Sequence, residues 1–155
     1  MSESFGSGIV ILTRSTALMI PGHPEGREVA QRRLLIVDDE EKVCHLLAEY
    51  FSLKGYEVRT ALRGEEALAL APVFHPDVVL LDLLLPGMDG VHTLKSLKQL
   101  TPPPKVLMLS AADHEDVGKG ALTLGADFYV CKPVNLHDLE HLVSGFYPSH
   151  KTNHY

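Results

Sequence analysis

Five polar residues occur where short apolar runs end. Asp38 and Asp39 follow "RLLIV", Asp82 closes "DVVLLD", Ser110 closes "KVLMLS", and Lys132 comes just after "ADFYV". A lone carboxylate is costly to bury unless a partner stabilises its charge. Carboxylates that meet in one crevice also repel each other, and Mg²⁺, which prefers oxygen ligands, would offset this together with a lysine. Such a site can bind or accept a phosphoryl group, with Asp82 as the nucleophile.

The elements that must position these residues alternate five times between strand and helix patterns. The run "DVVLLD" is apolar on both faces, which is typical of a central parallel strand. The expected strands are 33–37, 56–62, 77–82, 105–110 and 126–130, and the expected helices are 41–55, 64–71, 91–100, 113–125 and 135–147. Gly55 and Pro72 are expected to end the first two helices, and Asn135 to cap the last. The pattern predicts an α/β fold with an open parallel sheet and helices on both faces, which binds ligands beyond the carboxyl ends of its strands.

Composition narrows the class of protein. A chain of 155 residues with 22% charged residues is an ordinary globular mix, and a net charge of −6 argues against nucleic-acid binding. Two cysteines without a CxxC motif favour a reduced, cytoplasmic setting. The apolar runs are too short for a membrane span, and the N-terminus is a poor signal peptide.

The regular pattern covers only part of the chain. Residues 1–31 are an N-terminal extension of unknown role, which the sequence allows to be a strand pair, a docked arm or a leader. Residues 32–147 form the expected domain, and 148–155 a C-terminal tail too short for an output domain. The sequence leaves open whether this is a stand-alone domain or part of a longer regulator.

The motifs "VDDE", "DLLLPGMDG", "SA" and "GADFYVCKP" occur in this order, each at the end of an expected strand. In this order and at these intervals they resemble the receiver domain of bacterial two-component response regulators, of the chemotaxis-receiver type. The resemblance covers about Arg32 to Tyr147. It implies a flavodoxin-like five-stranded sheet in the order 2-1-3-4-5 and a role in a phosphorelay.

The resemblance also implies roles for individual acidic residues. Asp82 matches the aspartate that accepts the phosphoryl group. Asp39 matches the direct Mg²⁺ ligand, with Asp38 acting mostly through water. Asp82 and the backbone carbonyl of Leu84 would complete the protein's share of the metal shell.

Other matched positions would contact the phosphoryl group or transmit its arrival. Lys132, Ser110 and Ala111 match the lysine, the hydroxyl and the small residue beside the phosphoryl group. Ser110 and Tyr129 match the switch pair, and the peptide bond before Pro133 is expected to be cis. The resemblance thus implies both a phosphoryl-binding site and a switch.

Two more positions, Leu84 and Ala112, match residues that flank the phosphoryl group. Neither side chain can hold a water in line with phosphorus, so a long-lived aspartyl phosphate is expected. The surface expected to change on phosphorylation comprises 113–124, 126–130 and 135–146.

The implied partners are a sensor histidine kinase or a histidine phosphotransfer protein, and an output protein or domain. A homodimer is compatible with this. The chain would be a signalling module that at most catalyses its own phosphorylation and dephosphorylation, and not an enzyme. One alternative is a Mg²⁺-dependent phosphatase or phosphotransferase with an aspartyl nucleophile, although such enzymes place the nucleophile after the first strand. Asp82 and Lys132 could also form a fixed ion pair without chemistry, but a buried pair of that kind contributes little stability.

Overall fold

The computed structural model describes residues 31–111 and 115–148. The expected extension and tail lie outside this range, apart from residues 31 and 148, and so does Ala112. The elements run β1 (Arg32–Val37), α1 (Glu41–Leu53), β2 (Tyr56–Ala61), α2 (Gly64–Phe74), β3 (Val78–Asp82), α3 (Gly90–Lys98), β4 (Lys105–Ala111), α4 (Glu115–Thr123), β5 (Phe128–Lys132) and α5 (Leu136–Ser144).

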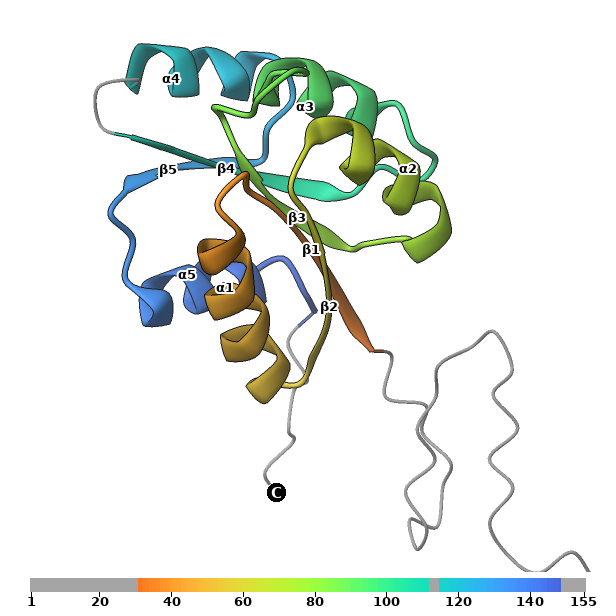
Figure 1. Ribbon diagram of the computed structural model, residues 1–155, viewed down its shortest axis with the longest axis vertical. Coiled ribbons are helices and arrows are strands. Elements are labelled where there is room, and N and C mark those ends of the chain that lie inside the picture. The colour runs from red at the N-terminus through yellow and green to blue at the C-terminus, as the bar shows by residue number, and fades with distance from the viewer. Residues whose placement is uncertain (1–30, 112–114, 149–155) are drawn as a thin grey trace, which may run out of the picture. The chain divides into compact units, whose positions relative to one another are not determined.

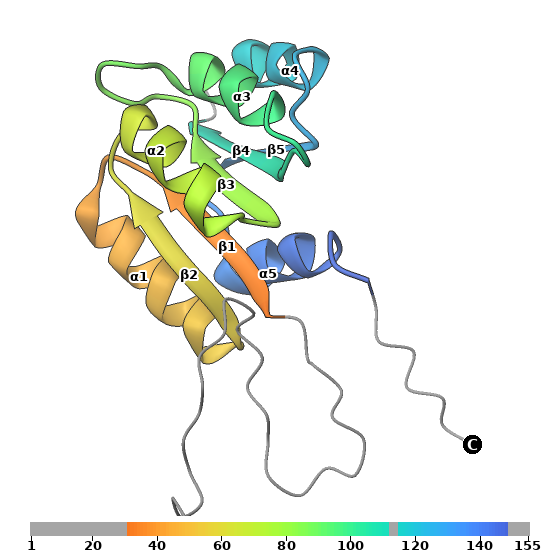
Figure 2. The same ribbon diagram turned by 90° about the vertical axis from the view of Figure 1, so that its right-hand side faces the viewer.

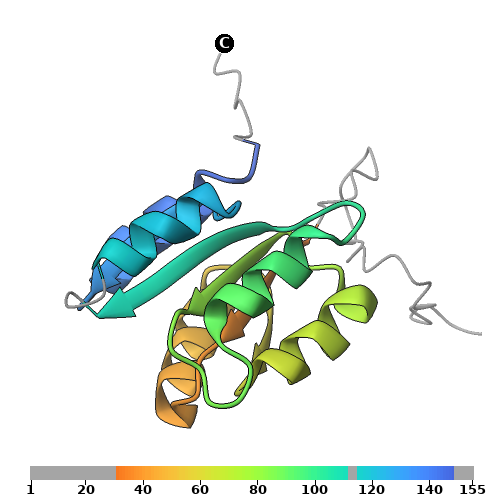
Figure 3. The same cartoon turned by 90° about the horizontal axis from the view of Figure 1, so that it is seen from above.

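The five strands form one parallel sheet in the order β2-β1-β3-β4-β5. Helices α1 and α5 cover one face, and α2, α3 and α4 cover the other (Figures 1 and 2). The strands twist relative to one another, as the view from above shows (Figure 3). The predicted fold class and the strand order implied by the resemblance are therefore confirmed.

Alternation along β1 explains how one strand serves two cores. Leu34 and Ile36 pack in the cluster under α1 and α5, whereas Leu35 and Val37 pack in the cluster under α2, α3 and α4. All four are at most 1% exposed, because successive side chains of a strand point to opposite faces of a sheet that is covered on both sides. Burial on both faces leaves only the ends of the central strands open to ligands.

Helix α2 differs from its sequence-based expectation. Pro72 does not end the helix, which continues to Phe74 and is followed by His75 in the left-handed conformation (φ 53°). Proline removes one backbone donor, but Phe74 is buried in the core and His75 N–H donates to Ala71 O. Packing of Phe74 outweighs the local cost of Pro72.

The last strand is also shifted relative to the prediction. β5 begins at Phe128 and includes Lys132, which pairs in register with Ala111 of β4. Asn135 caps α5 as predicted, since its side chain accepts hydrogen bonds from His137 N–H and Asp138 N–H. Among the described residues, no helix combines the length and the apolar character that crossing a bilayer requires.

Candidate functional site

Three carboxylates meet at the carboxyl ends of β1 and β3. These strands are parallel neighbours, with Val37 opposite Leu81, so the residues that follow them lie side by side. One ligand oxygen from each of Asp38, Asp39 and Asp82 lies within 4.8 Å of the others. Asp38 and Asp82 are 2% and 8% exposed, whereas Asp39 is open to solvent. The predicted acidic cluster is thus assembled by strand adjacency.

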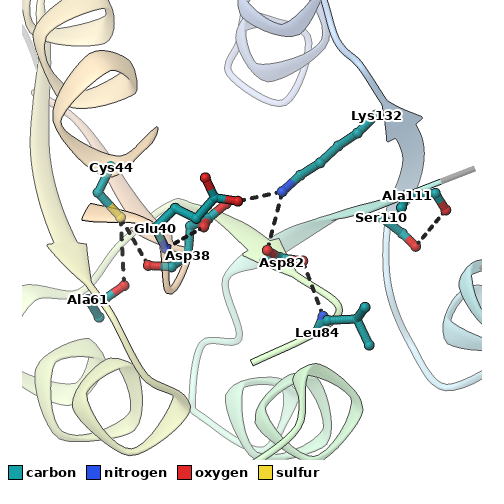
Figure 4. A network of polar contacts seen from close by, with 9 residues as sticks. All are labelled: Asp38, Glu40, Cys44, Ala61, Asp82, Leu84, Ser110, Ala111 and Lys132. Atoms are coloured by element: carbon teal, nitrogen blue, oxygen red, sulfur yellow. Dashed lines mark hydrogen bonds and ion pairs between the residues drawn. The ribbon is translucent and has the colours of Figure 1, made fainter. Parts of the chain in front are cut away.

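Lys132 crosses from β5 to the two buried carboxylates (Figure 4). Its Nζ atom lies 3.2 Å from Asp38 Oδ2 and 3.2 Å from Asp82 Oδ2. Burial by itself would lower the pKa of Lys132, but Asp82 and Asp38 together raise it above the ordinary lysine value. The ammonium is therefore a fixed positive charge between two carboxylates.

Backbone donors fix the remaining carboxylate oxygens. Glu40 N–H donates to Asp38 Oδ1 (2.9 Å), and Leu84 N–H donates to Asp82 Oδ1 (3.1 Å). Each buried carboxylate thus directs one oxygen to a backbone N–H and the other to Lys132 (Figure 4). Burial raises the pKa of Asp82, and Leu84 N–H and Lys132 oppose that rise.

Sequence reasoning missed two features of Asp38. The bridge from Lys132 to Asp38 had no signal in the motif, which suggested a pair with Asp82 alone. Cys44 was also not connected with the site, yet its thiol lies 3.2 Å from Asp38 O and donates to it. Burial, followed by the charge of Asp38, raises the pKa of Cys44 to about 11, so this thiol stays protonated and supports the turn. The sequence offered one clue to this contact, which is that Cys44 lies on the buried face of α1.

The loop after β3 depends on a glycine for its close approach to Asp82. A Cβ at Gly90 would lie 2.5 Å from the backbone oxygens of both Asp82 and Leu83, and Gly90 N–H donates to Leu83 O (3.0 Å). Asp89 then caps α3 by accepting from His92 N–H (2.7 Å). The start of α3 is therefore held directly against the strand end that carries Asp82.

The residues expected to sense the phosphoryl group lie on β4 and β5. Ser110 is 1% exposed, and its hydroxyl donates to Ala111 O (3.2 Å), pointing away from Asp82 (Figure 4). Tyr129 is half-buried, and its hydroxyl accepts from the Cys131 thiol (3.2 Å). The Lys132–Pro133 peptide bond is cis, as the resemblance implied. The structure thus gathers Asp38, Asp39, Asp82 and Lys132 at the crevice and places Ser110 and Tyr129 beside it in other contacts.

The donor set fits a divalent cation of the Mg²⁺ type. It consists of carboxylate oxygens, without cysteine or histidine, and one of the three carboxylates is exposed at the mouth of the crevice. Hard oxygen ligands around a partly open position are what Mg²⁺ prefers, because it retains several waters. Lys132 offsets the charge of the two buried carboxylates only in part.

The parallel sheet carries carboxylates and a lysine at the point where its strand order reverses. This arrangement defines a flavodoxin-like α/β domain with a crevice that can take ligands. A model of the response regulator receiver domain matches residues 34–144. The chain belongs to this family, and it is a receiver domain of the two-component type.

Individual relatives agree with the family match. The transcriptional regulator PhoP of Bacillus subtilis, named for alkaline phosphatase synthesis, is 43% identical over 66% of this chain and 42% of its own length. The regulatory protein AtoC of Escherichia coli is 40% identical over 74% of this chain and 25% of its own. The chain therefore spans only about a quarter to two fifths of these two relatives.

Solved structures show the same fold. The receiver domain of Francisella response regulator 1452 superposes with a TM-score of 0.70 at 30% identity, covering 76% of this chain and 97% of that one. The CheX–CheY complex with BeF₃ and Mg²⁺ from Borrelia burgdorferi gives a TM-score of 0.70 at 28% identity, covering 79% and 92%. Receiver domains are signalling modules, so the family match favours this function over the alternative of a phosphatase.

Proposed function

We propose that Asp82 is the phospho-accepting residue of this receiver domain. The observation that carries the proposal is the position of the Asp82 carboxylate, which lies at the end of the central strand β3 beside Lys132 and the acidic pair. Its Oδ1 atom is bound by Leu84 N–H, so its orientation is fixed before any donor arrives. Preorganisation of this kind supplies much of the catalysis in phosphoryl transfer.

In the proposed reaction a carboxylate oxygen of Asp82 attacks the phosphorus of a phosphohistidine. The new bond joins this oxygen to phosphorus, the phosphorus–nitrogen bond breaks, and the imidazole leaves. Lys132 then exchanges its contact with Asp82 for a phosphoryl oxygen while keeping Asp38, since its Nζ carries donors for both. The small Ala111 leaves room for the group, and the hydroxyl of Ser110 turns from Ala111 O to donate to it.

Mg²⁺ would be held by Asp39, Asp82 and the backbone carbonyl of Leu84, with Asp38 acting through water. When bound, it supplies positive charge that stabilises the phosphoryl oxygens in the transition state. Asp39 is the most exposed of the three carboxylates, which suits a ligand that meets an incoming hydrated ion.

The donor is proposed to be a sensor histidine kinase or a histidine phosphotransfer protein. After transfer, Ser110 and Tyr129 would shift α4, β5 and α5 to a second arrangement, which an output protein or output domain recognises. Two relatives that the chain covers in part are transcriptional and regulatory proteins, which supports an output of this kind.

The test uses the full chain with Mg²⁺ and acetyl phosphate, followed by intact-mass analysis. Wild type should gain one phosphoryl group, and Asp82→Asn should gain none. The matched control is Asp138→Asn, which removes an exposed carboxylate from α5 and should label like wild type. Labelling of Asp82→Asn at the wild-type level would refute the assignment.

A further inference from the structure

The ring of Tyr129 lies directly against the backbone of α4. A Cβ built on Gly118 would overlap the ring atoms Cδ2, Cε2 and Cζ of Tyr129, so no other residue fits at 118 while the ring keeps this position. Gly120 lies two residues further along the same helix. A Cβ built there would meet no atom of the surrounding structure within 4 Å. Of these two helical glycines, only Gly118 is required by its surroundings.

A second contact holds the other end of the same side chain. The Cys131 thiol donates to the Tyr129 hydroxyl at 3.2 Å, and the ring packs against the core cluster under α2, α3 and α4. Cys131 and Tyr129 are two residues apart on β5, so they project from the same face of the strand. The side chain is therefore fixed at its ring by α4 and at its hydroxyl by β5.

The composition of α4 makes this arrangement sensitive to change. Two glycines within its nine residues weaken the helix, because glycine loses more backbone freedom on folding than alanine does. Contact with the Tyr129 ring at Gly118 therefore adds to the core packing of Ala121 in holding this weak helix in place. If the ring left, α4 would lose that contact and keep the core packing of Ala121 together with its own weak helix preference.

We propose that Gly118 is a positioning residue: because it has no side chain, it leaves the space in which the Tyr129 ring packs in the resting receiver. This space beside Gly118 is called the seat of the ring. The inference rests on the proposed function, in which phosphorylation of Asp82 moves Tyr129. The structure corresponds to the resting arrangement, since the Ser110 hydroxyl is bound to Ala111 O and does not reach Asp82. When the ring leaves this seat, α4 loses the contact at Gly118 and can move. Movement of the ring thereby couples the phosphoryl site to the helix.

The main test compares Gly118→Ala with Gly120→Ala by titrating each variant with beryllofluoride in the presence of Mg²⁺. An alanine at 118 destabilises only the state in which the ring is seated, so apparent beryllofluoride affinity should rise by about tenfold. Gly120→Ala should bind within about twofold of wild type, because its added Cβ enters open space. Without beryllofluoride, Gly118→Ala should melt below wild type and Gly120→Ala above it.

Removing the ring provides the rescue. In a Tyr129→Ala background, Gly118→Ala should no longer lower the melting temperature, because the atoms it would overlap are gone. Cys131→Ala tests the seat without added bulk: loss of its hydrogen bond to Tyr129 should tighten beryllofluoride binding roughly two- to threefold. This variant keeps the proposal testable even if Gly118→Ala does not fold.

The outcomes separate the two proposals. If wild type gains a phosphoryl group at Asp82 but Gly118→Ala binds beryllofluoride no more tightly than Gly120→Ala, the seat is refuted and the receiver function stands. A destabilisation by Gly118→Ala that persists in the Tyr129→Ala background refutes the seat as well. If Gly118→Ala does not fold, Cys131→Ala decides, and unchanged or weaker binding refutes the seat. A wild-type chain that gains no phosphoryl group overturns both.

Discussion

Replacement of Lys132 by methionine should expose how strongly the site depends on one cation. Methionine keeps most of the length of the side chain and removes its charge. In the wild type, Nζ lies 3.2 Å from an oxygen of Asp38 and 3.2 Å from an oxygen of Asp82, and both of these carboxylates are buried. The variant leaves two buried carboxylates facing each other without a compensating charge.

The magnitude follows from these distances. At an effective dielectric constant of about 20, each ion pair at 3.2 Å is worth about 5 kcal/mol before desolvation. The ligand oxygens of Asp38 and Asp82 lie within 4.8 Å, which on the same scale is a repulsion of at least about 3 kcal/mol. Desolvation offsets much of the attraction, and the Lys132 side chain is 32% exposed, so solvent screens it. We expect Lys132→Met to lower the free energy of unfolding by about 2–4 kcal/mol.

The assay is urea denaturation at neutral pH with EDTA, repeated with Mg²⁺. The control is Lys95→Met, which removes an exposed lysine of α3 and should change stability by less than about 0.5 kcal/mol. Mg²⁺ should recover part of the loss in Lys132→Met, because it binds the native carboxylates. A loss in Lys132→Met no larger than in Lys95→Met would refute the reasoning.

The pH dependence of this variant has a definite sign. Burial raises the pKa of Asp82 even with Lys132 present, so the folded state binds a proton more readily than the unfolded state. As the pH falls through that raised pKa toward the ordinary carboxyl value of 3.8, protonation of Asp82 therefore increases the free energy of unfolding. Without Lys132 the effect should grow. The stability gap between wild type and Lys132→Met should consequently narrow as the pH falls through this window, and a gap that widens there would contradict it.

Three further outcomes are expected. Asp39→Ala should raise stability without metal by relieving repulsion and should abolish stabilisation by Mg²⁺; melting curves in which it responds fully to Mg²⁺ would exclude Asp39 as a ligand. Ser110→Ala should still gain a phosphoryl group by mass, but the amide shifts of α4, β5 and α5 on beryllofluoride addition should shrink, and shifts of wild-type size would remove Ser110 from the switch. Leu84 is 54% exposed beside Asp82, and Leu84→Asn should speed loss of the phosphoryl group by offering a hydrogen-bonding partner to the attacking water; release at the wild-type rate would show that this position does not set the lifetime.

The sequence by itself determined the fold class, and it named acidic residues and a lysine that the structure brings together in the candidate site. Apolar runs such as "VVLL" in β3 report burial on both faces, and the polar residues that end them must lie at one edge of a parallel sheet. The Asn135 cap could also be predicted from the sequence, because its hydrogen bonds join residues that are close in sequence. Pro72 shows the limit of local rules, since burial of Phe74 carried α2 beyond the residue expected to end it.

Only the tertiary structure decided which side chains of the site touch. The bridge from Lys132 to Asp38 and the seat of Tyr129 at Gly118 join residues from different elements, and their geometry depends on strand register and on the distance between a helix and the sheet. A glycine in a helix pattern gives the same local signal in two different surroundings. At Gly118 a neighbouring ring fills the space that a side chain would take, whereas at Gly120 that space is open. Periodicity and propensity report each residue's own backbone preference and burial, whereas a contact between elements is fixed by packing in three dimensions.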